Sequence, residues 1–243
     1  MPETSARAGG VCGLLGGTFD PIHRAHLALA SAALGSGLID RLRIVPAGRP
    51  PHRAAPRAGG AHRLAMVRLG VASLPSGLAA RCVVDAGEVE RVAPSYTIDT
   101  LERIRAELGP RQPLALILGA DAFLGLPSWH RWQDLLDHAH LLVAARPGHA
   151  LERERMPEAL RRLAGERHRA DGHALSTAPA GFIADLEMPP VDCSATEVRR
   201  ILAGPGGARA AAKLLPADVV RYILDHHLYA GTDGYTAAAA NRH

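Results

Sequence analysis

Two glycines, an aspartate-proline pair and two histidines follow the first apolar segment of the chain. Gly16 and Gly17 allow backbone N–H groups to approach a ligand closely. Asp20 is a favourable helix N-cap residue and Pro21 suits the first helical position, so a helix is expected to begin there. A helix that begins directly after a glycine turn presents unpaired N–H groups and a positive dipole end. This segment therefore predicts an anion site.

His23 and His26 are three residues apart and would share one face of that helix. Two imidazoles at a helix N-terminus can donate hydrogen bonds to phosphate oxygens and stabilise negative charge at a phosphorus atom. The spacing matches neither GxGxxG nor the P-loop, which needs a following lysine. By itself, the segment leaves three readings open: a nucleotide site, a plain turn and half of a metal site.

A second cluster lies late in the chain. Ser194 is a good N-cap, and Glu197 three residues later completes a capping box, which explains both residues without any function. Thr196 and Arg199 are not explained in this way. A helix N-terminus that carries two hydroxyls and a guanidinium can hold phosphate groups.

Short apolar segments alternate with helical patterns along the chain. This alternation favours a parallel sheet covered by helices on both faces, with ligands bound at the carboxyl ends of the strands. The expected strands are 11–16, 42–45, 81–85, 114–118, 141–144 and 182–186. The expected helices are 21–34, 61–73, 98–108, 194–202 and 217–226. Residues 151–173 are interpreted as a solvated helix or an insertion, and residues 204–212 as a loop.

The length of 243 residues fits one domain, which we place at residues 11–230, with residues 1–10 and 231–243 as flexible tails. No apolar segment is long enough to span a bilayer, and the amino terminus has no secretory signal pattern. The three cysteines are far apart and form neither a disulfide framework nor a zinc site. A cytoplasmic protein without a membrane partner is expected.

The formal net charge is +4, and 27 of the 28 basic residues are arginines scattered along the chain. Only 4% of the residues are aromatic, which disfavours stacking platforms for single-stranded nucleic acid. The composition therefore favours a nucleotide-sized anion as ligand and predicts no nucleic-acid partner.

The sequence GGTFDPIHRAH (residues 16–26) resembles the GGTFDPxHxGH signature of the nucleotidyltransferase superfamily, in which HxGH is the catalytic motif. Residues 194–199 are similar to its second motif, [ST]xTxxR, which holds the β- and γ-phosphates of a nucleoside triphosphate. Ala25 stands where the family usually has glycine. Because alanine adds a single methyl group and favours helix, we expect it to be tolerated.

Further segments resemble the bacterial nicotinate-nucleotide adenylyltransferases. They are VPAGRPPHR (45–53), PSYTIDTL (94–101), LGADAF (118–123) with Trp129 and Trp132 after it, RPG (146–148) and the terminal segment up to Tyr229. Arg53 replaces the usual lysine and keeps its charge. The resemblance runs from about Gly13 to Tyr229, nearly the whole chain.

The resemblance implies a doubly wound, Rossmann-like parallel sheet of the nucleotidyltransferase type in a single domain. It implies adenylyl transfer from ATP to nicotinate mononucleotide, giving nicotinate adenine dinucleotide and pyrophosphate in NAD biosynthesis. The mononucleotide phosphate would attack the α-phosphorus of ATP in line, without a covalent intermediate. Mg²⁺ would be carried with ATP, and the enzyme would be a monomer or a small homo-oligomer.

The same resemblance assigns the site residues. The catalytic residues would be His23, His26 and Arg199. The ATP-binding residues would be Gly16, Gly17, Thr18, Phe19, Gly119, Asp121, Arg146, Ser194 and Thr196. The nicotinate mononucleotide would be held by Arg53, Tyr96, Thr97, Trp129 and His130, and no protein side chain is assigned to a metal.

Several alternatives stay open. A phosphopantetheine or nicotinamide-mononucleotide adenylyltransferase would share the two motifs, although the phosphopantetheine family lacks the SYTxDTL and tryptophan segments. A nucleotide sensor could keep the fold without catalysis. A fragment of an aminoacyl-tRNA synthetase would need a KMSKS loop, and Lys213 is the only lysine of this chain. A zinc site would need ligands beyond the two histidines.

Overall fold

The computed structural model describes residues 10–49, 55–91, 93–145 and 155–230. Within them, six parallel strands form one sheet in the order β3-β2-β1-β4-β5-β6. The strands are β1 (Cys12–Gly17), β2 (Arg41–Pro46), β3 (Cys82–Val84), β4 (Leu114–Gly119), β5 (His140–Ala145) and β6 (Ile183–Glu187). The chain builds outward from β1 to β3, then returns to the other side of β1 with β4. The topological switch point therefore lies between β1 and β4.

Consecutive strand residues face two separate hydrophobic cores, so the sheet is buried on both sides. Leu15 and Ile117 belong to one core, whereas Leu14 and Leu116 belong to the other. The first core is covered by α1 (Arg24–Gly35), α2 (Gly60–Ala72), α8 (Ala195–Leu202), α9 (Gly207–Ala211) and α10 (Ala217–Asp225). The second is covered by α4 (Thr97–Leu108), α5 (Ala120–Leu124), α6 (Leu135–His138) and α7 (Glu158–Arg167). This arrangement confirms the predicted doubly wound fold.

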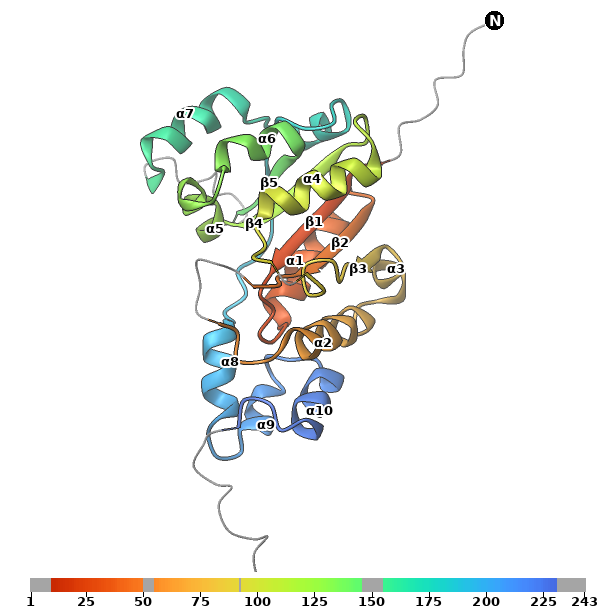
Figure 1. The fold of residues 1–243 in the computed structure, drawn as a ribbon, viewed down its shortest axis with the longest axis vertical. Helices are drawn as coiled ribbons and strands as arrows, with labels where there is room; N and C mark the ends of the chain where they lie inside the picture. Colours follow the sequence, from red (N-terminus) through yellow and green to blue (C-terminus); the bar gives the residue numbers. More distant parts are fainter. Residues whose placement is uncertain (1–9, 50–54, 92, 146–154, 231–243) are drawn as a thin grey trace, which may run out of the picture.

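The helices after β6 form a group of their own. Figure 1 shows α8, α9 and α10 together with α2 at one end of the molecule, and α5, α6 and α7 at the other. This grouping matters because α8 carries the second predicted motif, and α10 packs against α2.

The predicted strands and helices are present, and most of their ends agree within one or two residues. The short helices α5 and α6 were not predicted, nor were α3 (Ser76–Ala79), η1 (Leu126–Ser128), η2 (Trp132–Asp134) and η4 (Gly172–Ser176). Each spans no more than five residues, too few to show a periodic apolar pattern.

Two predictions on the second half of the chain were wrong in part. Residues 204–212 contain the helix α9 rather than a loop alone, because Gly207 and Ala211 are buried against the end of α8. A Cβ atom at Gly207 would lie 2.4 Å from the carbonyl oxygen of Ile201, so only glycine permits this approach. Helix α7 is not fully solvated, since Leu160 and Ala164 are buried.

The predicted tails, apart from Gly10, and residues 151–154 lie outside the described residues. None of the helices in the described part is long and apolar enough to cross a membrane. The limits of the domain, 11–230, stay a prediction.

Candidate active site

The loop after β1 does not pass directly into a helix. Helix α1 begins at Arg24 with His23 as its N-cap, so the expected start at Pro21 with Asp20 as cap was wrong. The Asp20 side chain instead accepts hydrogen bonds from the backbone N–H groups of Arg57 (2.8 Å) and Ala58 (3.0 Å). The Asp20 carboxylate, which the local sequence predicted to cap a helix, thus binds backbone N–H groups of a segment distant in sequence.

The two glycines of this loop differ in what surrounds them. A Cβ atom on Gly17 would lie 2.9 Å from the ring of Phe19, so a side chain there would displace this buried aromatic residue. A Cβ atom on Gly16 would meet no atom within 4 Å. Phe19 itself has a φ of 48°, which is uncommon for an aromatic residue and occurs often at functional sites.

The two histidines pack against each other at the start of α1. Their ring centroids are 3.7 Å apart and the rings are stacked. The Nδ1 atom of His26 accepts a hydrogen bond from the backbone N–H of His23 (3.3 Å). A neutral His26 must therefore carry its proton on Nε2, which makes that atom a hydrogen-bond donor.

Both imidazoles are neutral at physiological pH. Burial lowers the pKa of His23 to about 4. Burial, followed by the proximity of His23, holds the pKa of His26 well below its usual value. The Nδ1 atom of His23 is buried and has no hydrogen-bond partner within the described residues. The pair thus offers neutral hydrogen-bonding groups rather than a positive charge.

The second motif lies at the N-terminus of α8. Ser194 caps this helix by accepting a hydrogen bond from the N–H of Glu197 (3.2 Å). The Glu197 carboxylate forms a surface ion pair with Arg200 (3.7 Å) instead of the reciprocal bond of the predicted capping box. Arg199 donates to the Thr196 hydroxyl (3.3 Å).

Arg199 joins the two motifs, which are far apart in sequence. Its guanidinium donates to the backbone carbonyl of Asp20 (2.7 Å) and lies 3.7 Å from the Asp20 carboxylate. The loop after β1 and the start of α8 therefore meet at one place, and both predicted phosphate-binding motifs face each other there.

Arg63 was not identified from the sequence; it is a buried residue of α2 that holds the loop after β1 by hydrogen bonds. Its side chain is buried, and it donates to the carbonyls of Thr18 (2.7 Å), Gly48 (3.2 Å) and Ala58 (3.2 Å). Burial lowers the pKa of its guanidinium. Arg63 thereby ties the loop after β1 to the loop after β2, which leads toward Arg53. The only available signal was an arginine within an otherwise apolar helical face.

Glu88 is a second buried charged group that the sequence did not indicate. It accepts hydrogen bonds from the Thr100 hydroxyl (2.6 Å) and from the N–H of Gly48 (3.3 Å), and burial raises its pKa. A Cβ atom on Gly48 would lie 2.1 Å from the carbonyl oxygen of Glu88. Gly48 is therefore held on both sides, by Arg63 and by Glu88.

Four of the residues predicted for the mononucleotide lie at the start of α4 and in the turn after η1, next to the second core. Tyr96 is the N-cap of α4, Thr97 is its first residue, and the Tyr96 and His130 rings are 4.4 Å apart. Trp129, next to His130, is half-buried and packs against the second core. Trp132 is likewise half-buried and packs against the second core.

Gly119 and Asp121 lie at the carboxyl end of β4, beside the loop after β1. Gly119 is the N-cap of α5, and Asp121 is exposed in its first turn. A Cβ atom on Gly119 would meet nothing within 4 Å. Arg53 and Arg146, also predicted for the site, lie outside the described residues.

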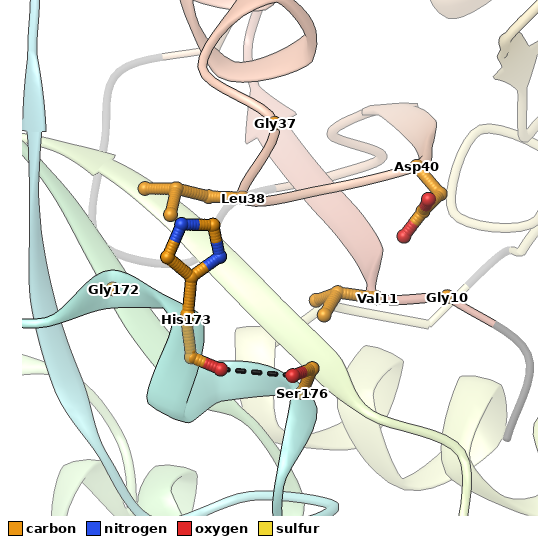
Figure 2. A pocket seen from close by; sticks show the side chains of 8 residues that line it. All are labelled: Gly10, Val11, Gly37, Leu38, Asp40, Gly172, His173 and Ser176. Atoms are coloured by element: carbon orange, nitrogen blue, oxygen red, sulfur yellow. Dashed lines mark hydrogen bonds between the residues drawn. The ribbon is translucent and has the colours of Figure 1, made fainter.

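A pocket of about 210 Å³ lies near the amino-terminal end of β1, at the end of the strand opposite to the candidate site. Figure 2 shows Asp40 and Gly10 on one side of it and His173 on the other, with Val11 between them. None of its lining residues belongs to either motif, and it is separate from the candidate site. Among the residues that the structure describes, no three acidic, histidine or cysteine side chains are placed to hold a metal ion.

Comparisons with known proteins agree with this geometry. The cytidylyltransferase-like family model matches residues 14–201. A probable nicotinate-nucleotide adenylyltransferase from Dechloromonas aromatica is 46% identical over 217 residues, which cover 89% of this chain and 96% of the relative. The namesake from Pseudomonas aeruginosa PAO1 is 45% identical with the same coverage.

Solved structures share the fold. Plasmodium falciparum nicotinic acid mononucleotide adenylyltransferase complexed with NaAD aligns with a TM-score of 0.68 at 17% identity, covering 90% of this chain and 97% of the other. A putative nicotinate-nucleotide adenylyltransferase from Vibrio parahaemolyticus aligns with a TM-score of 0.54 at 11% identity, covering 90% and 94% of the two chains.

Proposed function

This chain belongs to the cytidylyltransferase-like family and, within it, to the nicotinate-nucleotide adenylyltransferases, and from that premise we propose the reaction and the roles of its residues. The enzyme transfers the adenylyl group of ATP to nicotinate mononucleotide, giving nicotinate adenine dinucleotide and pyrophosphate in NAD biosynthesis. The single observation that carries this proposal is the meeting of the two motifs through Arg199 and Asp20 beside the switch point.

The attacking group is the phosphate of the mononucleotide, which is already anionic at neutral pH and needs no general base. It attacks the α-phosphorus of ATP in line with the departing pyrophosphate, so no covalent intermediate forms. Catalysis then consists of positioning and of stabilising charge on the phosphate oxygens.

The loop after β1 and the start of α8 hold the triphosphate. Backbone N–H groups of Gly17, Thr18 and Phe19 bind phosphate oxygens, with Gly16 leaving room for them. His26 donates its Nε2–H to an oxygen on the α-phosphorus, and His23 binds beside it. The leaving pyrophosphate is held by Ser194, Thr196 and Arg199, and the nucleotide is further held by Gly119, Asp121 and Arg146.

The start of α4 receives the nicotinate ring. The first N–H groups of a helix have no partner within it, so the N–H of Thr97 can bind the carboxylate of the pyridine ring. The N–H of His130, in the turn between η1 and η2, is the second donor. Trp129 stacks on that ring, Tyr96 lines the site, and Arg53 binds the mononucleotide phosphate. A carboxamide would direct its NH₂ group at one of the two donors and leave that donor unpaired.

Mg²⁺ enters as part of the MgATP substrate, bound by phosphate oxygens more than by the protein. When bound, the ion would reduce the negative charge on the triphosphate, and the protein residues named above would position the triphosphate.

The test is the release of pyrophosphate from MgATP by the purified protein, with nicotinate mononucleotide, nicotinamide mononucleotide and phosphopantetheine offered in parallel. We expect the acid to be preferred over the amide by roughly 5- to 150-fold in kcat/KM, since an unpaired donor costs ~1–3 kcal/mol. Equal use of acid and amide would contradict the assigned carboxylate site. Release with phosphopantetheine alone would show that the acceptor is wrong, and ATP binding without any release would indicate a sensor.

A further inference from the structure

Tyr229, near the carboxyl end of the described residues, contacts the candidate site from a distant part of the sequence. Its hydroxyl donates a hydrogen bond of 2.7 Å to Oδ1 of Asp20, 209 residues earlier in the chain. Both side chains are buried, with Asp20 4% exposed and Tyr229 8% exposed. This is a buried hydrogen bond to a residue of the first motif that also contacts Arg199 of the second motif.

The Asp20 carboxylate is surrounded by donors. Oδ1 accepts from Tyr229 and from the N–H of Ala58, and Oδ2 accepts from the N–H of Arg57. Arg199 approaches the same carboxylate but stays 3.7 Å away, while its nearer hydrogen bond goes to the Asp20 backbone carbonyl. The carboxylate is therefore satisfied without a close ion pair to Arg199.

The backbone of Tyr229 supports a specific placement. Its φ is 63°, in the left-handed region that an aromatic residue enters at a cost. Burial and the hydrogen bond to Asp20 hold the residue there. The same two factors raise the pKa of its phenol, so it remains a donor throughout the physiological range.

We propose that Tyr229 is a positioning residue for ATP, which acts through Asp20 to keep the Arg199 guanidinium available to the triphosphate. This inference rests on the proposed function, in which Arg199 holds the leaving pyrophosphate. An anionic carboxylate beside a triphosphate site competes for the nearest cation. By donating to Oδ1, the Tyr229 hydroxyl reduces that competition. Without it, Asp20 draws Arg199 into a close ion pair and away from the phosphates.

The substitution Tyr229→Phe removes the hydroxyl and keeps the ring. We expect the dissociation constant of MgATP, measured by calorimetry without an acceptor, to rise about tenfold, the effect of losing one hydrogen bond to a charged group. In steady-state assays, KM for ATP should rise while KM for nicotinate mononucleotide changes less than about twofold. A role confined to folding would not separate the two substrates.

Tyr222→Phe is the matched control on the same terminal segment. The Tyr222 hydroxyl pairs with Nδ1 of His62 (3.0 Å), on α2, and has no contact with Asp20. This variant should bind MgATP as the parent protein does. Thermal melting of both variants establishes that each is folded at the assay temperature.

A double-mutant cycle shows whether Tyr229 acts through Arg199. In an Arg199→Met background, Tyr229→Phe should weaken MgATP binding less than about twofold further. Unchanged MgATP binding in Tyr229→Phe, or a full tenfold loss in both backgrounds, would overturn the inference. Because binding is measured without an acceptor, this result is independent of whether nicotinate mononucleotide is the acceptor.

Discussion

At the scale of single residues, the proposed chemistry depends on two imidazoles that burial keeps neutral. The hydrogen bond from the His23 N–H to Nδ1 of His26 fixes the proton of His26 on Nε2. A neutral donor of fixed orientation can stabilise charge that develops on an α-phosphate oxygen without first binding the ground-state triphosphate as tightly as a cation would.

Replacing His26 with alanine should lower kcat by about 10²–10³-fold, the usual effect of removing a donor that acts in the transition state. Pyrophosphate release under saturating substrates measures this change. His173→Ala is the control, because His173 is exposed and lines the pocket near the amino-terminal end of β1, away from the candidate site. A loss of less than about threefold in His26→Ala would show that the donor lies elsewhere.

The low pKa of His23 also predicts how stability depends on pH. The unfolded chain binds a proton at His23 below about pH 6.5, whereas the folded protein does so only near pH 4. The contribution of this group to the free energy of unfolding is therefore constant above pH 6.5 and falls as the pH is lowered toward 4.

Urea denaturation at pH 7 and pH 5 checks this prediction. In the parent protein the His23 contribution should fall by about 2 kcal/mol between these values, since one pH unit corresponds to ~1.4 kcal/mol. His23→Asn lacks this term, so the stability difference between the two proteins should shrink by that amount. A difference that is the same at both pH values would show that His23 titrates normally in the folded state.

At the scale of secondary-structure elements, the N-termini of α1 and α8 must both be positioned against the loop after β1. Ser194 serves α8 as its N-cap whatever else it binds, so its two roles have to be separated by experiment. Aspartate is an equally good N-cap but carries a negative charge.

Ser194→Asp should keep the free energy of unfolding within about 0.5 kcal/mol of the parent value and raise KM for ATP at least about tenfold through repulsion of the triphosphate. Ser194→Ala should lose about 1 kcal/mol of stability as a cap. If Ser194→Asp used ATP as well as the parent protein, the phosphates would not lie at this helix start.

Arg63 connects elements rather than substrates. Arg63→Met leaves the carbonyls of Thr18, Gly48 and Ala58 without their donor and should lower the free energy of unfolding by at least about 3 kcal/mol. Arg68→Met, on the exposed side of the same helix, should change it by less than about 0.5 kcal/mol. Chemical denaturation of the two variants makes the comparison, and equal stabilities would show that Arg63 does not hold the loops.

The local sequence pattern predicted the helices and strands well, but it did not predict the contacts between them. The apolar spacing of α4 and the strand at Leu114 were predictable because each depends on neighbouring residues. Asp20 was assigned to a helix cap because its partners, Arg57, Ala58 and Tyr229, are distant in sequence. Arg63 was missed for the same reason. The motif residues, by contrast, could be proposed from the sequence because each motif is a short contiguous segment with a recognisable spacing.

At the scale of the whole molecule, both proposed substrate sites belong to one domain built on a single sheet. Ligand binding at either site should therefore stabilise the entire domain. MgATP at 100 times its dissociation constant should add about 2.7 kcal/mol to the free energy of unfolding. Calorimetry should show one thermal transition that moves upward with ligand. Two transitions, of which MgATP moves only one, would contradict a single domain.

The central claim is adenylyl transfer to nicotinate mononucleotide, and ATP labelled with ³²P on the α-phosphorus tests it most directly. After incubation with the protein, Mg²⁺ and nicotinate mononucleotide, the account predicts the label in nicotinate adenine dinucleotide and unlabelled pyrophosphate as the second product. Label found on the protein as a covalent adenylate, or only in AMP with no dinucleotide formed, would contradict it.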